Sequence, residues 1–128
     1  MKISNVLSLL MSIPLMCGPG YGHSAQAGEA DVVAVAVTKA GGQEYRFDVT
    51  VLHDDEGWDH YANRWEVLDA EGNILATRVL AHPHVNEQPF ERSLGNVAIP
   101  ADITSVTIRA HDSVHEHGGV EVTIQLPD

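Results

Sequence analysis

The stretch EYRFDVTVLH, residues 44–53, alternates apolar and polar side chains without a break. Its apolar positions, from Tyr45 to Val51, are spaced two apart. Successive side chains of a β-strand point to opposite faces, so this pattern predicts a strand with one buried face. His53 continues the same register, which predicts a histidine at the rim of the core.

Further short segments of this kind follow at regular intervals, separated by turn signals such as GGQ and AEGN. β-branched and alternating residues predict strands over 31–40, 63–69, 74–83, 88–99, 103–113 and 119–127. No segment carries a sustained helical period, and there are no internal repeats. The sequence therefore predicts an all-β domain.

Seven short strands in about 100 residues, with turns every 8 to 12 positions, resemble an immunoglobulin-like β-sandwich. Trp65 on the third strand fits that resemblance. So does VAIPADITSVTIRA, residues 97–110, which resembles the corner between two strands of fibronectin type III modules, although the tyrosine of that corner is missing. The resemblance implies an immunoglobulin-like β-sandwich of about seven strands, and a fold alone implies little about function.

The first 27 residues have the features of a secretory signal peptide. Lys2 precedes an apolar run over 6–17, and AQA follows at 25–27, so we expect cleavage after Ala27 and one domain over 28–128. The apolar run is too short to span a membrane, which needs about 20 residues. This predicts a periplasmic or secreted protein.

The sequence also allows two other ways in which the leader could be processed. Cleavage after Gly22 would make His23 the first residue, an arrangement that resembles the histidine brace of copper-binding sandwiches. Cys17 invites a lipoprotein interpretation, but the preceding PLM lacks the small residues expected before a lipidated cysteine.

Composition narrows the kinds of partner. The only cysteine and all three methionines precede residue 28, so the predicted domain has no disulfide and no soft sulfur ligand. The formal net charge of −11 makes nucleic acid and anionic membrane surfaces poor partners and favours cations.

Counting strands places the histidines of the predicted domain at one end of the sandwich. If the strands run alternately up and down, the loops at one end receive all of these histidines, and the loops at the other end receive none. They are His53, His60, His82, His84, His111, His115 and His117. Carboxylates lie in the same loops, where they can ligate a metal or orient imidazole rings: Asp54, Asp55, Glu56, Asp59, Glu87, Asp112 and Glu116.

This segregation predicts a transition-metal site, because imidazole is a common ligand of Zn and Cu. Histidines two apart in extended chain share a face at about 6.5 to 7 Å, so the pairs at 82/84 and 115/117 can each converge on one ion. We expect Cu(II) or Zn(II). The preferred ligands are His60, His82, His84, His111 and His115, with His53 and His117 as further candidates.

Other interpretations stay open. A histidine in an acidic loop is usually solvated, and His111 follows the outward register of Arg109, so it and His53 could belong to different surfaces. Trp58 and Tyr61 are expected to pack over the rim of the sandwich. The histidine-rich loops could instead bind a protein partner in a pH-dependent way.

Catalysis has little support, because the sequence contains no nucleophile elbow. The paired cysteines of copper–zinc superoxide dismutase and the cysteine ligand of superoxide reductase are also missing after residue 27. The stretches GWDHYANRWEVL, HPHVNEQPF and IRAHDSVHEHGG resemble a group of small exported bacterial proteins, His-rich β-sandwiches, and this resemblance implies no particular activity.

Overall fold

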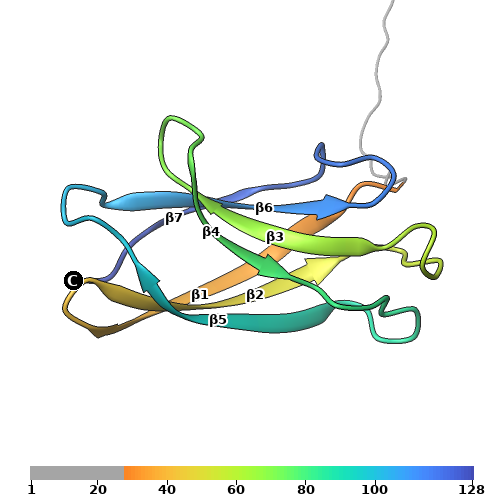
Figure 1. The fold of residues 1–128 in the computed structure, drawn as a ribbon, viewed down its shortest axis with the longest axis horizontal. Helices are drawn as coiled ribbons and strands as arrows, with labels where there is room; N and C mark the ends of the chain where they lie inside the picture. Colours follow the sequence, from red (N-terminus) through yellow and green to blue (C-terminus); the bar gives the residue numbers. More distant parts are fainter. Residues whose placement is uncertain (1–27) are drawn as a thin grey trace, which may run out of the picture.

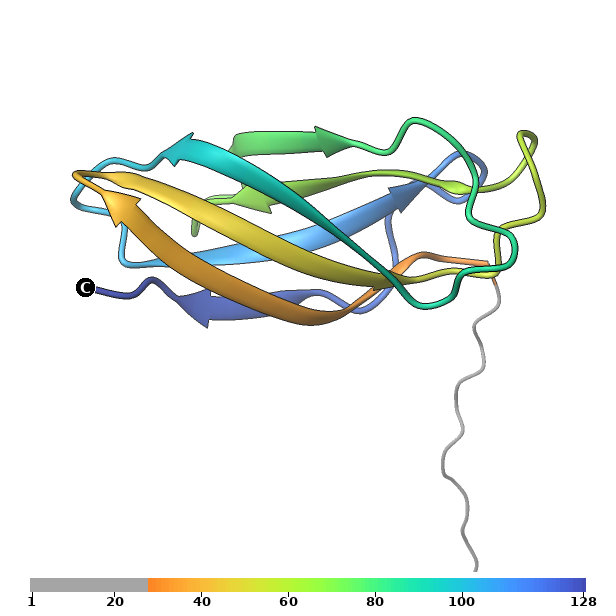
Figure 2. The same cartoon turned by 90° about the horizontal axis from the view of Figure 1, so that it is seen from below.

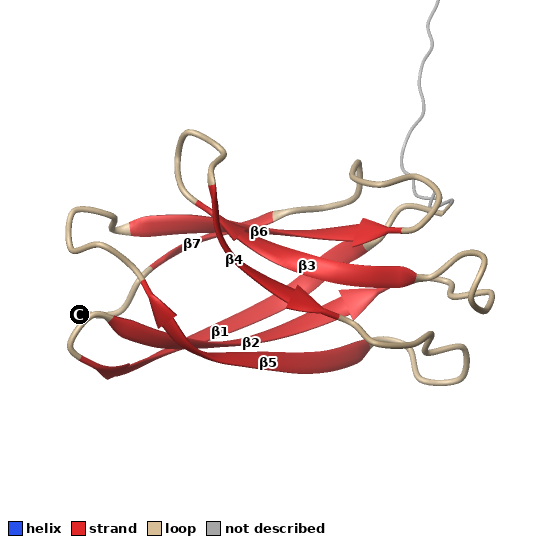
Figure 3. Cartoon of the chain, viewed as in Figure 1, coloured by secondary structure: helices blue, strands red, loops and turns tan. Residues whose placement is uncertain are grey.

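The computed structural model describes residues 28–128. The predicted signal peptide, both cleavage alternatives and Cys17 lie outside the described residues. Within them the secondary structure is entirely β, as Figure 3 shows. No described segment forms a helix long and apolar enough to cross a membrane.

The strands occur in the order and near the positions that the sequence predicts. β4 ends at Val79 rather than at Pro83, because its pairing with β3 extends only to the Arg64–Val79 pair. The bounds are β1 (Asp31–Gly41), β2 (Glu44–Leu52), β3 (Ala62–Leu68), β4 (Ile74–Val79), β5 (Phe90–Ala98), β6 (Ser105–Asp112) and β7 (Val122–Gln125).

The strands form two antiparallel sheets packed face to face (Figures 1 and 2). One sheet has the order β1-β2-β5 and the other has the order β4-β3-β6-β7. The second and fifth strands pair with each other, as do the third and sixth, and the chain crosses between the sheets after β2, β4 and β5. The prediction of an immunoglobulin-like sandwich of seven strands is confirmed.

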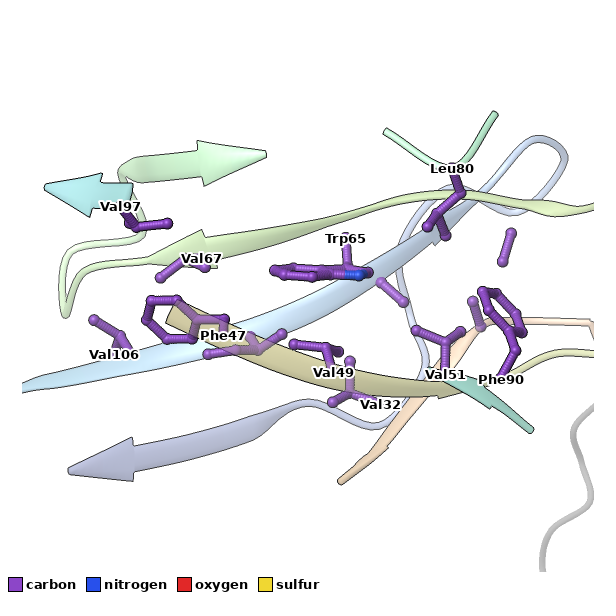
Figure 4. Close-up of a cluster of buried hydrophobic side chains, with 14 of the residues drawn as sticks. Val32, Phe47, Val49, Val51, Trp65, Val67, Leu80, Phe90, Val97 and Val106 are labelled. Atoms are coloured by element: carbon purple, nitrogen blue, oxygen red, sulfur yellow. The ribbon is translucent and has the colours of Figure 1, made fainter. Parts of the chain in front are cut away.

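The core fills the space between the sheets. β2 buries every second residue from Tyr45 to Val51, and Trp65 on β3 is fully buried, as the sequence predicts. Figure 4 shows the Trp65 indole in the layer between the sheets, with Phe47 and Val49 reaching it from the opposite side. β6 alternates in the same way, with its outer face partly exposed.

One end of the sandwich collects the loops after β2, β4 and β6 together with the residues before β1 (Figure 1). We call this end the histidine pole; it comprises residues 28–30, 53–61, 80–89 and 111–121. Antiparallel pairing in both sheets brings these segments together. The turns at the other end lie over 41–44, 69–73 and 99–104. All the histidines of the described chain therefore lie at one pole.

Truncation of a core valine tests the inward register of β2. Val49→Ala is expected to lower the free energy of unfolding by about 2 kcal/mol, because Val49 is fully buried and two methyl groups are lost. Val79→Ala on β4, where the side chain is 64% exposed, is the matched control, with an expected change within about 0.5 kcal/mol. Urea unfolding followed by tryptophan fluorescence measures both, and equal losses would contradict the register.

Candidate metal centre

The histidine pole divides its imidazoles into three groups. Neighbouring rings in each group lie with centroids 4.8 to 4.9 Å apart, with His60 between the other two rings of the first group. The three groups are His53 with His60 and His115, His82 with His84, and His111 with His117. The sequence-predicted ligands are therefore not all brought together.

The first group converges on one backbone oxygen, the carbonyl of Gly28. His53 Nε2 lies 2.8 Å from this oxygen, His60 Nε2 3.3 Å and His115 Nδ1 2.9 Å. His53 follows β2, His60 precedes β3 and His115 follows β6, so both sheets contribute a ring. We call these three histidines with Asp112 the His₃Asp cluster.

Asp112, the last residue of β6, completes the cluster. Its side chain is fully buried, and its Oδ2 lies 3.1 Å from His60 Nε2, 3.2 Å from His115 Nδ1 and 3.9 Å from His53 Nε2. The inward alternation of β6 places this carboxylate on the core side, whereas His111 faces outward. Asp112 Oδ1 is buried with no hydrogen-bond partner in the described part of the chain, and buried carboxylates rarely remain in that condition.

Asp112 also shapes the turn that carries His115. Its Oδ2 accepts hydrogen bonds from the backbone N–H groups of Val114 and His115, at 3.1 and 2.9 Å. Burial opposes ionisation, but these two hydrogen bonds and the nearby His53 lower the pKa of Asp112 overall. The cluster therefore contains an ionised carboxylate in a buried position.

A second buried carboxylate, Asp55, orients His53. Its Oδ1 lies 2.5 Å from His53 Nδ1 and also accepts a hydrogen bond from the Ala62 N–H, and its Oδ2 accepts one from the His84 N–H. Asp55 is 3% exposed. This buried carboxylate therefore links the end of β2, the start of β3 and the loop after β4. This pairing places a ring proton of His53 on Nδ1, the nitrogen that faces Asp55.

His60 has the same arrangement at the surface. Its Nδ1 lies 2.9 Å from Glu56 Oε1, while its Nε2 faces Asp112 and Gly28. Burial lowers the pKa of His60, but the hydrogen bonds with Glu56 and the Gly28 carbonyl and the charges of Asp112 and Glu56 raise it overall. This position therefore favours a positive charge.

The hydrogen bonds that His53 and His60 make through Nδ1 leave the Nε2 atom of each ring facing only hydrogen-bond acceptors. A neutral imidazole carries one N–H, and in His53 and His60 that proton is held by a carboxylate at Nδ1. The Nε2 lone pairs then point toward oxygens that can only accept. A second proton on each ring, compensated by the neighbouring carboxylates, or one divalent cation between the rings would satisfy the Nε2 atoms. One divalent cation satisfies both rings at once.

The donor set suits Zn(II) or Cu(II). Around an ion with metal–ligand distances of about 2.0 to 2.2 Å, neighbouring donor atoms lie about 2.8 to 3.8 Å apart. The distances from His60 Nε2 and His115 Nδ1 to Asp112 Oδ2, 3.1 and 3.2 Å, lie in that range, whereas the distance from His53 Nε2, 3.9 Å, lies just outside it. Donor atoms of His53, His60 and Asp112 all lie within 4.8 Å of one another. Imidazole nitrogen is a borderline donor of the kind these metals prefer, and one carboxylate oxygen can complete such a site.

The His82 and His84 pair has a different environment. His84 stacks on Phe90 with centroids 4.0 Å apart, and its Nε2 lies 2.8 Å from an Arg92 nitrogen. Burial, the charge of Arg92 and the neighbouring His82 lower the pKa of His84. The guanidinium occupies the Nε2 lone pair, so this ring is poorly placed to bind a cation.

The His111 and His117 pair lies on the outer face of β3 and β6. His111 Nδ1 contacts Asn63 Oδ1 at 2.6 Å, and His117 Nε2 is 3.3 Å from Glu66 Oε1 without hydrogen-bond geometry. Glu66 is already paired with two arginine side chains, each at 2.7 Å. Burial, the charge of Arg64 and the neighbouring His117 lower the pKa of His111. The nearby guanidinium groups disfavour a divalent cation here.

Trp58 corrects one expectation about the loop after β2. It does not pack over the rim of the sandwich, because its side chain is 67% exposed and contacts Tyr61 edge to face at 5.6 Å. The polar loop around it, stabilised by the hydrogen bond from Glu56 N–H to His60 O, holds the pair away from the core.

Comparison with known proteins finds one similar sequence. The chain is 41% identical over 96 residues to a protein of Halomicrobium mukohataei named "Putative lipoprotein". The match covers 75% of the chain and 47% of the relative, so the chain spans about half the length of the curated relative it matches. No protein-family profile and no solved structure matches the chain.

Removal of Asp55 is expected to loosen the pole. Asp55→Ala leaves His53 Nδ1 and two backbone N–H groups without a partner, which we expect to cost about 3 kcal/mol or more in metal-free protein. Asp54→Ala is the matched control, because Asp54 is exposed, and its expected change is within about 0.5 kcal/mol. Urea unfolding in the presence of a chelator measures both, and a small loss for Asp55→Ala would show that the carboxylate does not organise the pole.

The environment of His84 predicts a pH dependence. Because its pKa in the folded protein lies below the ordinary 6.5, the unfolded chain binds more protons, and stability from this group is lost as pH falls below about 6.5. In Arg92→Gln, removal of the guanidinium is expected to move the titration midpoint of His84 upward. NMR titration of the imidazole carbons measures the shift, and an unchanged or lower midpoint would contradict the assignment.

Proposed function

We propose that this protein is exported and binds one divalent transition-metal ion, Cu(II) or Zn(II), at the His₃Asp cluster. The observation that carries the proposal is the pair of imidazoles whose Nδ1 atoms face carboxylates while their Nε2 atoms converge with Asp112. Metal-bound histidines commonly have this carboxylate partner, which fixes the ring and leaves the other nitrogen free. The proposed ligands are His53 Nε2, His60 Nε2, His115 Nδ1 and Asp112 Oδ2.

Access and charge support the same role. The cluster borders a solvent-open pocket lined by Gly28, His53, Asp54, Glu56 and His60, among others, so an ion can enter without unfolding of the sandwich. The net charge of −11 attracts cations to the surface. A site with four protein donors and partial solvent access suits the sequestration, delivery or sensing of metal.

The expected location is the cell envelope. The apolar leader with AQA before residue 28 supports export, and the Halomicrobium mukohataei relative is named "Putative lipoprotein". The described domain contains no cysteine, so in an oxidising compartment its metal ligands cannot be lost to thiol oxidation.

Exposed Trp58 favours a second candidate function, recognition of a protein partner. Its ring pairs with Tyr61 directly beside the ligand His60, and exposed tryptophan is enriched at interaction sites. The absence of stoichiometric metal binding would favour this function over the first.

Metal titration with histidine variants tests the proposal. Chelator-treated protein is expected to bind one equivalent of Cu(II) or Zn(II) more tightly than about 1 μM, measured by calorimetry and elemental analysis. His60→Gln is expected to weaken binding at least about 100-fold, because one of four donors is lost, whereas His82→Gln, at the same pole but outside the cluster, retains it.

A second matched pair separates the cluster from the outer face. His115→Gln is expected to weaken binding and His111→Gln to leave it unchanged, although both residues belong to the same stretch of chain. Circular dichroism confirms that each variant is folded. Binding weaker than micromolar by the unchanged protein, or equal losses in both members of a pair, would overturn the proposed site.

A further inference from the structure

The four proposed side-chain ligands do not explain why the Gly28 carbonyl lies among three imidazole rings. Its carbonyl oxygen faces three imidazole nitrogens at 2.8, 2.9 and 3.3 Å, yet a carbonyl has only two lone pairs to accept hydrogen bonds. These separations equal those between neighbouring donor atoms around a metal ion of this size, about 2.8 to 3.8 Å. The Gly28 oxygen therefore lies where a fifth donor would lie.

The segment that follows Gly28 is fixed by burial and hydrogen bonds. Ala30 is buried, the Val32 N–H donates to the Val120 carbonyl at 2.9 Å, and the Val120 N–H donates to Asp31 Oδ1 at 2.8 Å. Close approach also depends on Gly119, where a Cβ atom would overlap the Ala30 carbonyl. The residues before β1 are thus fastened to the loop that carries His115.

Only glycine fits at position 28. A Cβ atom there would overlap the His115 imidazole. The absence of a side chain lets the backbone itself reach the imidazoles. A backbone that approaches so closely is suited to donate its own atoms to an ion.

Gly28 is also the residue that follows the predicted cleavage position, Ala27. Cleavage there would convert the Gly28 peptide nitrogen into a free α-amine. By covalent geometry this nitrogen lies at most about 3.6 Å from the Gly28 oxygen. Nitrogen and oxygen of one terminal residue can close a five-membered ring with a metal ion through N, Cα, C and O.

We infer that Gly28 is a metal ligand, through its carbonyl oxygen and through the α-amine that leader cleavage after Ala27 creates. This inference rests on the proposed function, since it adds donors to the His₃Asp cluster. Cleavage completes the coordination sphere, so the processed protein binds metal more tightly than any form that retains residues before Gly28. Metal capture is thereby favoured in protein that has been exported and processed.

Two chains that differ by one residue test the inference. One begins at Gly28 and the other retains Ala27; both contain all seven strands and the whole core, and mass spectrometry confirms each first residue. The chain that retains Ala27 is expected to bind Cu(II) at least about 10-fold more weakly, because the Gly28 amine is lost as a ligand while the other donors remain. Labelling with ¹⁵N-glycine is expected to alter the nitrogen hyperfine pattern of bound Cu(II) only in the chain that begins at Gly28.

The outcomes separate this inference from the proposed function. If both chains bind with equal affinity and the label changes nothing, Gly28 is no amine ligand, and the His₃Asp cluster stands without it. If neither binds more tightly than micromolar, the proposed function fails. Sequencing of the exported protein gives an independent answer, because a first residue of Cys17 or His23 would overturn the role of the Gly28 amine.

Discussion

The buried carboxylate of Asp55 holds the histidine pole together. It accepts hydrogen bonds from the His53 ring, from the start of β3 at Ala62 and from the loop after β4 at His84. A charged group is expensive to bury unless such donors surround it, so all three segments must be in place together. The orientation of His53, and with it the whole cluster, follows from this requirement.

The cluster also crosses the boundary between the two sheets. His53 extends β2 in one sheet, whereas His60, Asp112 and His115 flank β3 and β6 in the other, and Gly28 precedes β1. The described domain has no cysteine and so no disulfide to link its sheets. Because an ion bound by folded ligands stabilises the folded state, metal at this position would serve as the missing cross-link. Function and stability would then depend on the same few side chains.

Much of this arrangement was predictable from the sequence. The alternation of β2 predicts its buried face, the turn signals predict seven strands, and the count of strands predicts one pole for all the histidines, since antiparallel order is regular. The inward register of β2 also predicts His53 at the rim of the core, where it is 2% exposed. These features are periodic along the chain, so local pattern is sufficient.

The grouping of the histidines was not predictable in the same way. Asp112 could have been distinguished from the other acidic residues, because it continues the inward series of Val106, Ile108 and Ala110. His84 is kept out of the cluster by its contacts with Arg92 and Phe90, and His117 lies against Glu66 instead. These contacts join side chains from different segments, so the local sequence does not indicate them. The position of Gly28 depends on the loop after β6, and nothing in its own neighbourhood indicates it.

The sequence by itself determined the two-sheet fold and the end at which the histidines gather, because strand period and strand order are properties of the chain alone. Only the tertiary structure decided which of them face a common point, because that choice depends on the direction of each ring. Ring direction is set by buried partners such as Asp55 and Asp112, which are brought near only when the sheets close.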